Sequence, residues 1–492
     1  MYILGIDQST QGTKAMVYDE KGRILARSDA PHRQLIDERG WVEHNPMEIK
    51  ANVLQVVAAV IDKAGIDKSQ IAGVGISNQR ETAMMWDKKT GRPIYNAIVW
   101  QCARGAKICE RIERAGYAPM VKQATGLHLS PYFSAAKLAW IVENVDGVKA
   151  QLEQKNSQIC CGTMDSWLIY CLTGEFKTDY SNASRTQLFN INTLTWDEKI
   201  CALFNLSSKN LPEVCDSNAV YGYTDFDGLL PHKIPVNAVM GDSHAALYGQ
   251  FCHNPGEIKS TYGTGSSIMM NVGDKVIHSQ KGLVSSIAWS FDGKVQYVLE
   301  GNINYTGAVI TWLKDNLHLI NSPQECEALA RQANPADKTY LVPAFTGLGA
   351  PYWDSEATAT LTGMTRVTGA NEIVKAALDS IAYQIADIVN LMREESGLAI
   401  TALRVDGGPT KNKYLMQFQS DILNIAVHVS NTEELSACGV AYMAGITLGI
   451  YDKDEVAKSI ERQQYNAAIT AADREKLYKG WQRAVTNTLM YG

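Results

Sequence analysis

The feature that most constrains the fold is a pattern that occurs twice, near the start of each half of this 492-residue chain. In the first copy, an apolar stretch at 2–6 is followed by small and polar residues at 8–13 and a β-prone stretch at 14–18. Residues 256–274 repeat the order of strand, Gly/Ser/Thr turn and strand. One such turn is usually a plain hairpin. Two copies favour two α/β domains of similar design, with turns whose backbone N–H groups bind an anion.

The bulk properties narrow the class of protein. The length exceeds one typical core and suggests about two to four domains. The repeated pattern favours two, residues 1–245 and 246–492. A net charge of −6 without a basic block argues against a nucleic-acid partner. No apolar run approaches the roughly 18 residues of a membrane span, the N-terminal residues lack a secretion signal, and the ten cysteines form no C-x-x-C motif. We therefore expect a cytoplasmic protein with no membrane partner.

The segments between these features predict helices that cover a sheet. Asn45 is placed to cap a helix whose apolar residues recur on one face, and a buried type of strand follows at 71–77. In the second half, a long helix from 371 to about 392 precedes a strand at 402–408. Residues 436–449 carry small side chains at helical spacing, which favours close packing of that helix against its neighbours. This order indicates the α/β class.

Two aspartates stand where ligands bind in α/β sheets. Asp7 ends the first apolar stretch, and Asp242 follows the apolar strand at 234–240 and Gly241, before a probable helix. The carboxyl end of a strand is the usual ligand side of such a sheet, and hard cations such as Mg²⁺ prefer oxygen ligands. Asp242 also fits a helix N-cap, and the two interpretations are compatible.

Two further motifs are ambiguous when taken alone. Arg80 and Glu81 follow the strand at 71–77 and offer a donor beside an acceptor, which suits the neighbouring hydroxyls of a polyol, but an adjacent pair of this kind is often only a surface ion pair. Gly407 and Gly408 end a strand before a helix, where they allow either a close approach to a ligand or a tight turn. The sequence has neither a P-loop nor a strand-linked G-x-G-x-x-G motif.

Several long segments together resemble the FGGY family of carbohydrate kinases, and within it the glycerol kinases. They include "SNQRET" (77–82), "PYFSAAKLAWIVENV" (131–145), "TDYSNASRTQLFNINTLTWD" (178–197), "LVPAFTGLGAPYWD" (341–354) and "GGPTKNKYLMQFQSDIL" (407–423). The resemblance covers essentially the whole chain. It implies two actin-like domains of the ribonuclease-H type with a ligand cleft between them. It also implies ATP-dependent phosphorylation of a primary hydroxyl of a small polyol or sugar, with Mg²⁺, by a homo-oligomer (dimer or tetramer).

The resemblance also implies roles for individual residues. Asp242 is expected to be the general base, and Asp7 and Asp242 to hold Mg²⁺, directly or through water. The acceptor site would be lined by Arg80, Glu81, Trp100, Tyr132, Asp242, Ser243 and Ser267. ATP and its phosphates would contact Ser9, Thr10, Gln11, Gly12, Thr13, Lys14, Gly263, Thr264, Gly265, Gly307, Gly407, Gly408 and Asn412. The first domain would bind the acceptor and the second the nucleotide.

Three serines depart from the pattern of the family. Ser9 stands where the first turn usually has glycine, and we expect Gly12 to supply the freedom that this turn needs. Ser243 replaces a glutamine, and Ser267 replaces a phenylalanine that contacts the carbons of glycerol. Two larger side chains have thus become serines, which predicts a roomier and more polar pocket and an acceptor larger than glycerol, such as a longer polyol or a ketose.

Two alternatives stay open. One is a pentulose kinase of the xylulose or ribulose type within the same family. The other is a non-kinase actin-like ATPase, which would share Asp7 and both turns but would have no reason to keep Arg80, Glu81 and Asp242 together.

Overall fold

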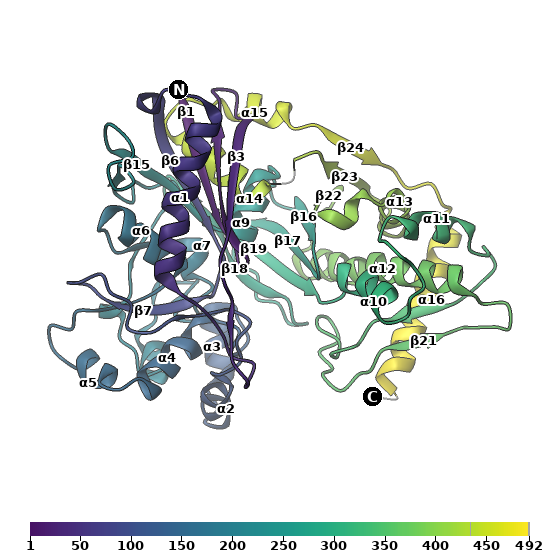
Figure 1. The fold of residues 1–492 in the computed structure, drawn as a ribbon. Helices are drawn as coiled ribbons and strands as arrows, with labels where there is room; N and C mark the ends of the chain where they lie inside the picture. The colour runs from purple at the N-terminus through teal and green to yellow at the C-terminus, as the bar shows by residue number, and fades with distance from the viewer. Residues whose placement is uncertain (433, 491–492) are drawn as a thin grey trace.

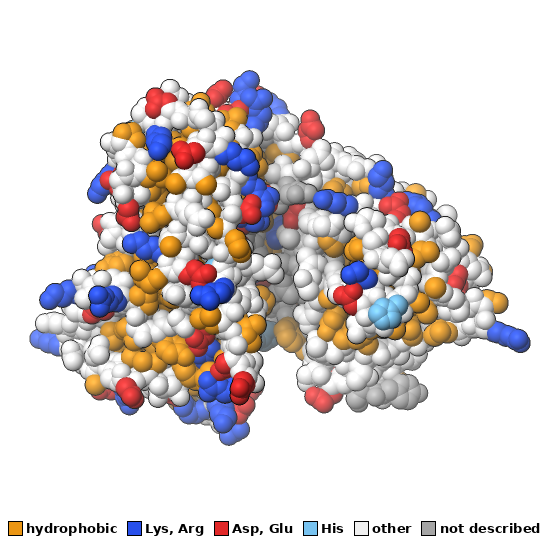
Figure 2. Space-filling view, viewed as in Figure 1, with side chains coloured by type: hydrophobic (Ala, Val, Ile, Leu, Met, Phe, Trp, Pro, Cys, Tyr) orange, Lys and Arg blue, Asp and Glu red, His pale blue; other side chains and the backbone are white. Residues whose placement is uncertain are grey.

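A six-stranded and a seven-stranded sheet form the centres of two lobes, at the left and right of Figure 1. The structure is a computed structural model and describes residues 1–432 and 434–490. The first lobe is built mainly from the N-terminal half of the chain and the second mainly from the C-terminal half. The space-filling view shows a hollow between them (Figure 2).

The sheet of the first lobe has the order β14-β15-β6-β1-β2-β3. β1 pairs with β2 in antiparallel fashion and with β6 in parallel fashion, and β15 is parallel to β6. The carboxyl ends of β1, β6 and β15 therefore meet at one edge of the sheet. The strands are β1 (Tyr2–Gln8), β2 (Gly12–Tyr18), β3 (Ile24–Pro31), β6 (Ile71–Asn78), β14 (Tyr223–Thr224) and β15 (Ile234–Gly241).

Helix α1 (Pro46–Ala64) covers one face of this sheet. The side chain of Asn45 accepts a hydrogen bond from the backbone N–H of Met47, which confirms the predicted start of the helix. Its apolar face lies in a core with residues of β1, β2 and β6. Burying this face holds the helix to the sheet, because each large aliphatic side chain contributes about 1.5–3 kcal/mol when it is removed from water.

Helices α9 (Asp242–Gly249) and α14 (Leu435–Thr447) pack together on the opposite face, between the two large sheets. A Cβ atom on Gly439 would lie 1.9 Å from the carbonyl oxygen of Ala245, and one on Gly75 would lie 2.4 Å from that of Val440. Only glycine fits at these two contacts. The close packing predicted from the small residues of 436–449 is confirmed. The expected division between residues 245 and 246 falls inside α9.

The sheet of the second lobe has the order β18-β19-β17-β16-β22-β23-β24. α12 (Ala370–Ser396), which includes the predicted long helix, and α13 (Lys413–Leu423) pack in one core with residues of this sheet. The strands are β16 (Ile258–Tyr262), β17 (Ser266–Gly273), β18 (Val284–Phe291), β19 (Lys294–Ile303), β22 (Ala402–Asp406), β23 (Ala426–Ser430) and β24 (Arg462–Tyr465).

A five-stranded sheet with the order β4-β5-β8-β7-β9 completes the first lobe and lies at the lower left of Figure 1. It comprises β4 (Leu35–Ile36), β5 (Val42–His44), β7 (Ala83–Asp87), β8 (Ala97–Ile98) and β9 (Ile159–Thr163). The adjoining helices are α2 (Ala106–Arg114), α3 (Ala118–Thr125), α4 (Ser134–Asn144), α5 (Val148–Leu152) and α6 (Met164–Thr173).

Shorter elements connect these layers. In the first half of the chain they are β10 (Lys177–Asp179), α7 (Tyr180–Ala183), β11 (Phe189–Asn190), β12 (Thr195–Trp196), α8 (Glu198–Leu203) and β13 (Glu213–Cys215). In the second half they are α10 (Gly307–Asp315), α11 (Glu325–Gln332), β20 (Tyr340–Val342), β21 (Thr360–Thr362), α15 (Lys453–Ser459) and α16 (Ala471–Met490). Across residues 1–432 and 434–490, no helix combines the length and the apolar character that a membrane crossing requires.

Candidate active site

Two carboxylates lie at the carboxyl ends of β1 and β15, which flank β6. Asp7 is buried and accepts a hydrogen bond from the Ser77 hydroxyl at 2.9 Å. Burial raises the pKa of Asp7 to about 6, against the opposing effect of Lys14. Asp242 is the first residue of α9, and the N-cap is Gly241, so the N-cap interpretation of Asp242 is wrong. The side chain of Asp242 is 34% exposed, which leaves its carboxylate open to a ligand.

A buried ionic cluster holds Asp242 in place. The Arg80 Nε lies 3.3 Å from Asp242 Oδ1, and the two Nη atoms of Arg80 donate to both oxygens of Glu300, at 2.9 and 3.0 Å. Arg185 donates from Nε to Glu81 at 2.6 Å and lies 3.0 Å from Glu300 through Nη1. Burial alone would raise the pKa of Glu300, but Arg185 and Arg80 outweigh it and hold that pKa well below its usual range. The cluster fixes Arg80 between Asp242 and Glu300.

Sequence reasoning missed Arg185 and Glu300. Glu300 lies on β19 of the second lobe, whereas its two partners belong to the first, so the pairing emerges only when the lobes are assembled. A weak signal was present, because Glu300 interrupts the apolar run "YVLEGNI" (297–303) of a strand. An acidic residue in such a run is seldom buried without a cation beside it.

Glu81 adopts a backbone conformation that non-glycine residues rarely occupy, with a φ of +62°. Its carbonyl oxygen accepts a hydrogen bond from the Ser134 hydroxyl at 3.1 Å, and its carboxylate binds Arg185. Strain of this kind costs on the order of 1–3 kcal/mol and concentrates at functional sites. The contacts to Ser134 and Arg185 offset that cost and orient the side chain.

Two aromatic side chains lie beside the cluster. The ring centroids of Trp100 and Tyr132 are 5.4 Å apart, and the Arg185 guanidinium lies 6.0 Å from the Tyr132 ring centre. The Trp100 Nε1–H donates to the hydroxyl of Thr10 at 2.9 Å, which ties this wall to the tip of the first turn. Arg80, Glu81, Trp100, Tyr132 and Asp242 are thus brought together, although they come from separate parts of the sequence.

Lys137 supports the loop that carries Tyr132. It is buried, and its ammonium donates to the carbonyl oxygens of Pro131 at 2.8 Å and Phe133 at 3.1 Å, as well as to that of Tyr132. Burial lowers the pKa of Lys137 to about 7. Sequence reasoning missed this residue, because a lysine in a helix otherwise indicates an exposed face.

The first turn uses its unusual serine internally. The backbone N–H and the hydroxyl of Ser9 both donate to the carbonyl oxygen of Gly12, at 2.9 and 3.0 Å. The expectation that Gly12 supplies conformational freedom is wrong, because its φ is not in the left-handed region. Glycine is needed there for space, since a Cβ atom would lie 2.8 Å from the carbonyl oxygen of Ala30.

The other residues of this turn divide between two faces. In the ladder of β1 and β2, Lys14 is opposite Asp7 and Thr13 is opposite Gln8, so the side chains of Lys14 and Thr13 point to opposite faces. Lys14 shares the face of Asp7 and binds Glu434 at 2.8 Å. The buried Thr13 side chain is directed away from that face, and the exposed Gln11 lies at the tip of the turn.

The second turn opens on a cavity of about 740 Å³ in the second lobe. Hydrogen bonds from Gly307 to Gly263 and from Ala308 to Thr264 join this turn to the start of α10. The cavity is lined by five of the residues expected to contact ATP, namely Gly263, Thr264, Gly307, Gly408 and Asn412, together with apolar side chains that include Ile310, Leu378, Ile381 and Leu415.

Two of the remaining predictions, Gly407 and Gly265, concern residues next to this cavity. Gly407 has a φ of +100°, and a Cβ atom there would lie 2.0 Å from the Tyr262 carbonyl oxygen. At Gly265, a Cβ atom would lie 2.3 Å from the Ile303 carbonyl oxygen. Both glycines are therefore required by tight backbone contacts. Asn412 is the N-cap of α13, so its side-chain oxygen is already bonded to a backbone N–H.

The two serines that are expected in the acceptor site lie on contacting elements, α9 and β17. Ser243 is half-buried in the first turn of α9, directly after Asp242. Ser267 lies near the start of β17, and its hydroxyl is buried without a hydrogen-bond partner in the described part of the chain.

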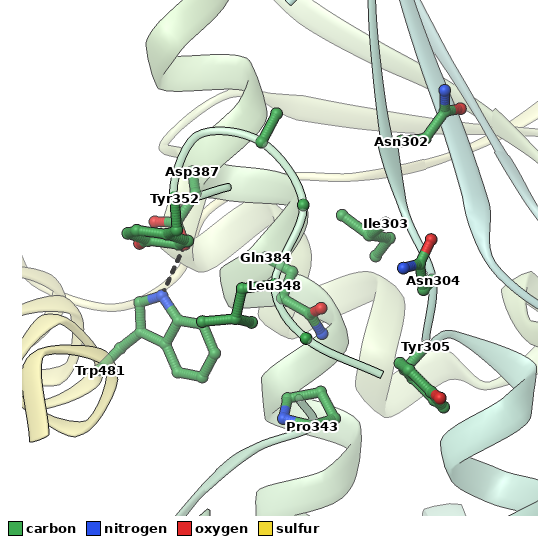
Figure 3. Close-up of a pocket in the computed structure, with 13 residues that line it drawn as sticks. Asn302, Ile303, Asn304, Tyr305, Pro343, Leu348, Tyr352, Gln384, Asp387 and Trp481 are labelled. Atoms are coloured by element: carbon green, nitrogen blue, oxygen red, sulfur yellow. Dashed lines mark hydrogen bonds between the residues drawn. The ribbon is translucent and has the colours of Figure 1, made fainter. Parts of the chain in front are cut away.

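A second cavity, behind β19, is too small for a substrate. Its volume is about 20 Å³, close to the smallest space that holds a water molecule (Figure 3). On one side Asp387 accepts hydrogen bonds from Tyr352 and Trp481, each at 2.8 Å, which fixes the loop 343–352 against α12 and α16. This cavity belongs to the packing of the second lobe.

Comparison with known proteins identifies the family. The model of the FGGY carbohydrate kinase N-terminal domain matches residues 2–249, and that of the C-terminal domain matches residues 258–448. Glycerol kinase 1 of Thermotoga maritima is 49% identical over 493 residues, which cover 99% of this chain and 100% of the relative. A glycerol kinase of Thermoanaerobacter pseudethanolicus is 45% identical and covers 100% of this chain and 99% of its own.

Solved structures agree with this assignment. The crystal structure of Plasmodium falciparum glycerol kinase with ADP has a TM-score of 0.94 and 36% identity, covering 99% of this chain and 98% of its own. A ligand-bound xylulose kinase from Lactobacillus acidophilus, at 22% identity, shares the fold with a TM-score of 0.88 over 99% of this chain and 98% of its own. The predicted two-domain α/β fold, consistent with actin-like domains, is confirmed. The chain belongs to the FGGY family of carbohydrate kinases, which are ATP-dependent phosphotransferases that act on a hydroxyl group.

Proposed function

We propose that this kinase transfers the γ-phosphoryl group of ATP to a primary hydroxyl of a small polyol or sugar, with Asp242 as the general base. The supporting observation is the cluster in which Arg80 lies 3.3 Å from the Asp242 carboxylate and beside Glu81. The names of the relatives, which are glycerol kinases at 45–49% identity, support a small polyol as the acceptor class. The acceptor is larger than glycerol, because Ser243 and Ser267 leave room in the pocket.

The acceptor would lie against the aromatic pair of Trp100 and Tyr132, with its hydroxyls bound by Arg80 and Glu81. Aromatic faces pack against the C–H groups of the acceptor, while the paired charges supply donors and acceptors to its hydroxyls. Because Arg80 is anchored by two hydrogen bonds to Glu300, it binds without reorganising. Asp242 would then face the reacting hydroxyl and take its proton.

The nucleotide would occupy the cavity of about 740 Å³. This volume falls within the range of small-molecule sites, and its apolar side chains suit a purine ring. Gly263 and Thr264 of the second turn, together with Gly307, line this cavity and would lie against the phosphates, with the Thr264 hydroxyl as a donor to a phosphate oxygen. We therefore assign nucleotide binding to residues 246–492, and acceptor binding and the general base to residues 1–245. Glu300, in the second half, would support the acceptor site by binding Arg80.

Asp7 and Asp242 would hold the magnesium ion that accompanies ATP. A buried carboxylate whose pKa is raised to about 6 fits such a role, since a cation favours its ionised form. Mg²⁺ is usually bound by one or two carboxylates plus phosphate oxygens, and the described residues contain no group of three or more His, Cys, Asp or Glu that would form a complete protein cage. When bound, the ion neutralises charge on the transferred phosphoryl group.

The chemistry depends on positioning. Phosphoryl transfer has a loose transition state, so alignment and charge neutralisation matter more than covalent help. Closure of the two lobes would exclude water, which otherwise competes with the acceptor hydroxyl. The cytoplasmic location and the homo-oligomeric state, a dimer or tetramer, stay predictions.

A coupled assay of ADP formation tests the proposal. Purified enzyme with ATP and Mg²⁺ is offered glycerol, tetritols, pentitols and pentuloses, and we expect ADP formation to depend on the acceptor. Asp242→Asn should lower kcat by about 10³-fold while nucleotide affinity, measured by calorimetry, stays within about two-fold. Asp452→Asn, which changes the exposed N-cap of α15, is the matched control.

Each outcome has a definite meaning. ATP turnover that does not depend on an acceptor would support the actin-like ATPase alternative. Highest efficiency with a pentulose would place the protein with the pentulose kinases, and highest efficiency with glycerol would refute the larger acceptor. Full turnover by Asp242→Asn would remove Asp242 from the role of base.

A further inference from the structure

We propose that Asn302 and Ser267 form an additional part of the acceptor site, which binds the additional hydroxyls of an acyclic acceptor of four or five carbons. This inference rests on the proposed function, because it extends the same site. It adds a residue, Asn302, that the comparison with the family pattern did not indicate, and it commits to a class of substrate.

The register of the second sheet places the two side chains together. β17 and β19 are antiparallel, and Ser267 lies directly opposite Asn302. Directly opposed residues point to the same face of a sheet, with Cβ atoms about 4.5–5.5 Å apart. Glu300, two residues before Asn302 on β19, shares that face. Since Glu300 is bound by Arg80, this face continues the acceptor cluster that begins at Asp242.

The chemistry of the pair fits a hydroxylated ligand. The Ser267 hydroxyl is buried without a hydrogen-bond partner within residues 1–432 and 434–490. A buried hydroxyl without a partner costs free energy that a ligand donor or acceptor would recover. Asn302 is exposed, and its Nδ2 lies 3.3 Å from Glu300 Oε1. Its amide supplies both a donor and an acceptor, as a polyol requires.

The orientation of Asn302 leaves it available. Asn302 is among the residues that line the small cavity behind β19, but in Figure 3 its side chain points away from that cavity, whereas that of Ile303 points toward it. Within the described part of the chain, the amide of Asn302 is bonded to Glu300 and not to the loop 343–352. An asparagine that serves neither the core nor this loop is placed to serve a ligand.

The space opposite Asn302 argues for an acceptor longer than glycerol. Asn302 Nδ2 and Arg80 Nη2 both lie against Glu300 Oε1, at 3.3 and 3.0 Å, so one acceptor can contact both side chains. Opposite Asn302, the small side chain of Ser267 stands where the family pattern has a phenylalanine. That difference leaves space for carbons beyond the third, whose hydroxyls Asn302 and Ser267 would bind.

Kinetics on four proteins test the inference: wild type, Asn302→Ala, Ser267→Phe and the control Gln296→Ala. Gln296 is an amide at the far end of β19. We expect the wild type to prefer a tetritol, pentitol or pentulose over glycerol in kcat/KM. Asn302→Ala should lower kcat/KM for the preferred acceptor by about ten-fold, which is the effect of one lost hydrogen bond. The kcat/KM for glycerol should stay within about two-fold of the wild-type value. Ser267→Phe should shift the preference toward glycerol.

The failures are distinguishable. If the wild type phosphorylates no acceptor, the proposed function itself fails. If the wild type phosphorylates acceptors but Asn302→Ala lowers kcat/KM equally for glycerol and the longer acceptors, or for none of them, the extended site is refuted while the kinase assignment stands. Asn302 is exposed, so its truncation should leave the thermal midpoint unchanged and the kinetic test valid even if Ser267→Phe folds poorly.

Discussion

Replacing Glu300 by glutamine should reveal how strongly the buried ionic cluster supports the protein. Glu300 is fully buried and is the shared partner of Arg80 and Arg185, whose side chains are 6% and 2% exposed. Glu300→Gln keeps the size of the side chain but removes its charge. Two guanidiniums would then share Glu81 as the only other fully buried carboxylate of the cluster.

The magnitude follows from the burial. Removing one partner of a buried ion pair costs roughly 3–5 kcal/mol, because the remaining charge stays desolvated. With an unfolding entropy of about 2.1 cal/mol/K per residue, a lobe of about 250 residues that loses about 3 kcal/mol should melt about 6 °C lower. Arg80 should also loosen, so we expect KM for the acceptor to rise by about ten-fold.

Thermal unfolding and steady-state kinetics check both numbers. The matched control is Glu257→Gln, which breaks a partly exposed pair with Arg404 (27% and 21% exposed) and should cost no more than about 1 kcal/mol. A difference of 1–2 °C between the melting temperatures of the two variants corresponds to about 1 kcal/mol or less. If the variants differ by no more than this, and Glu300→Gln keeps the wild-type KM for the acceptor, the buried cluster does not support the site.

Three further predictions concern single residues. Lys137→Met removes the ammonium that binds three carbonyls of the Tyr132 loop, so KM for the acceptor should rise by about ten-fold while KM for ATP stays within about two-fold in steady-state assays. Ser9→Gly should change kcat and KM for ATP by less than about three-fold, because the serine hydroxyl is bonded to Gly12 within the turn; a larger loss would show direct phosphate binding. Burial lowers the pKa of His253 from its usual 6.5 to about 3, so the folded state excludes a proton and stability falls as the pH drops below about 6.5. Urea unfolding at pH 7.5 and 5.0 measures the loss of unfolding free energy between these two pH values. This loss should be about 2 kcal/mol smaller in His253→Gln than in the wild type, and an equal loss in both proteins would contradict the burial argument.

Local patterns predicted most of the secondary structure because each depends on nearby residues. The cap at Asn45 and the apolar face of α1 were predicted from the sequence, because capping and helical periodicity depend on residues only a few positions apart. The small residues of α14 predicted close packing, although not that its neighbours would be Gly75 and Ala245 of the first half. Which elements meet across long separations is not encoded in such patterns.

The candidate site shows the same limit. Asp7 and Asp242 were found because carboxylates at strand ends have a known place in α/β sheets. Glu300, Arg185 and Lys137 were missed because their significance comes from burial and from partners in distant segments. The interpretation of Gly12 failed for a related reason: the sequence shows a glycine but not whether it is required by its φ angle or by the approach of a neighbouring strand.

β19 connects the two halves of the proposed reaction. Glu300 on this strand binds Arg80 beside the general base, and seven residues later Gly307 lines the cavity assigned to the nucleotide. Gly307 is bonded to Gly263 in the second turn, so phosphates held there would constrain the segment that follows β19. An acceptor that binds Arg80 would constrain Glu300, which lies at the other end of the segment 300–307. Each ligand thus orders a segment that the other also uses, and by linkage each should increase the affinity for the other. Calorimetric titration of a non-hydrolysable ATP analogue, with and without the preferred acceptor, should show this as tighter binding in its presence, and Glu300→Gln should abolish the difference.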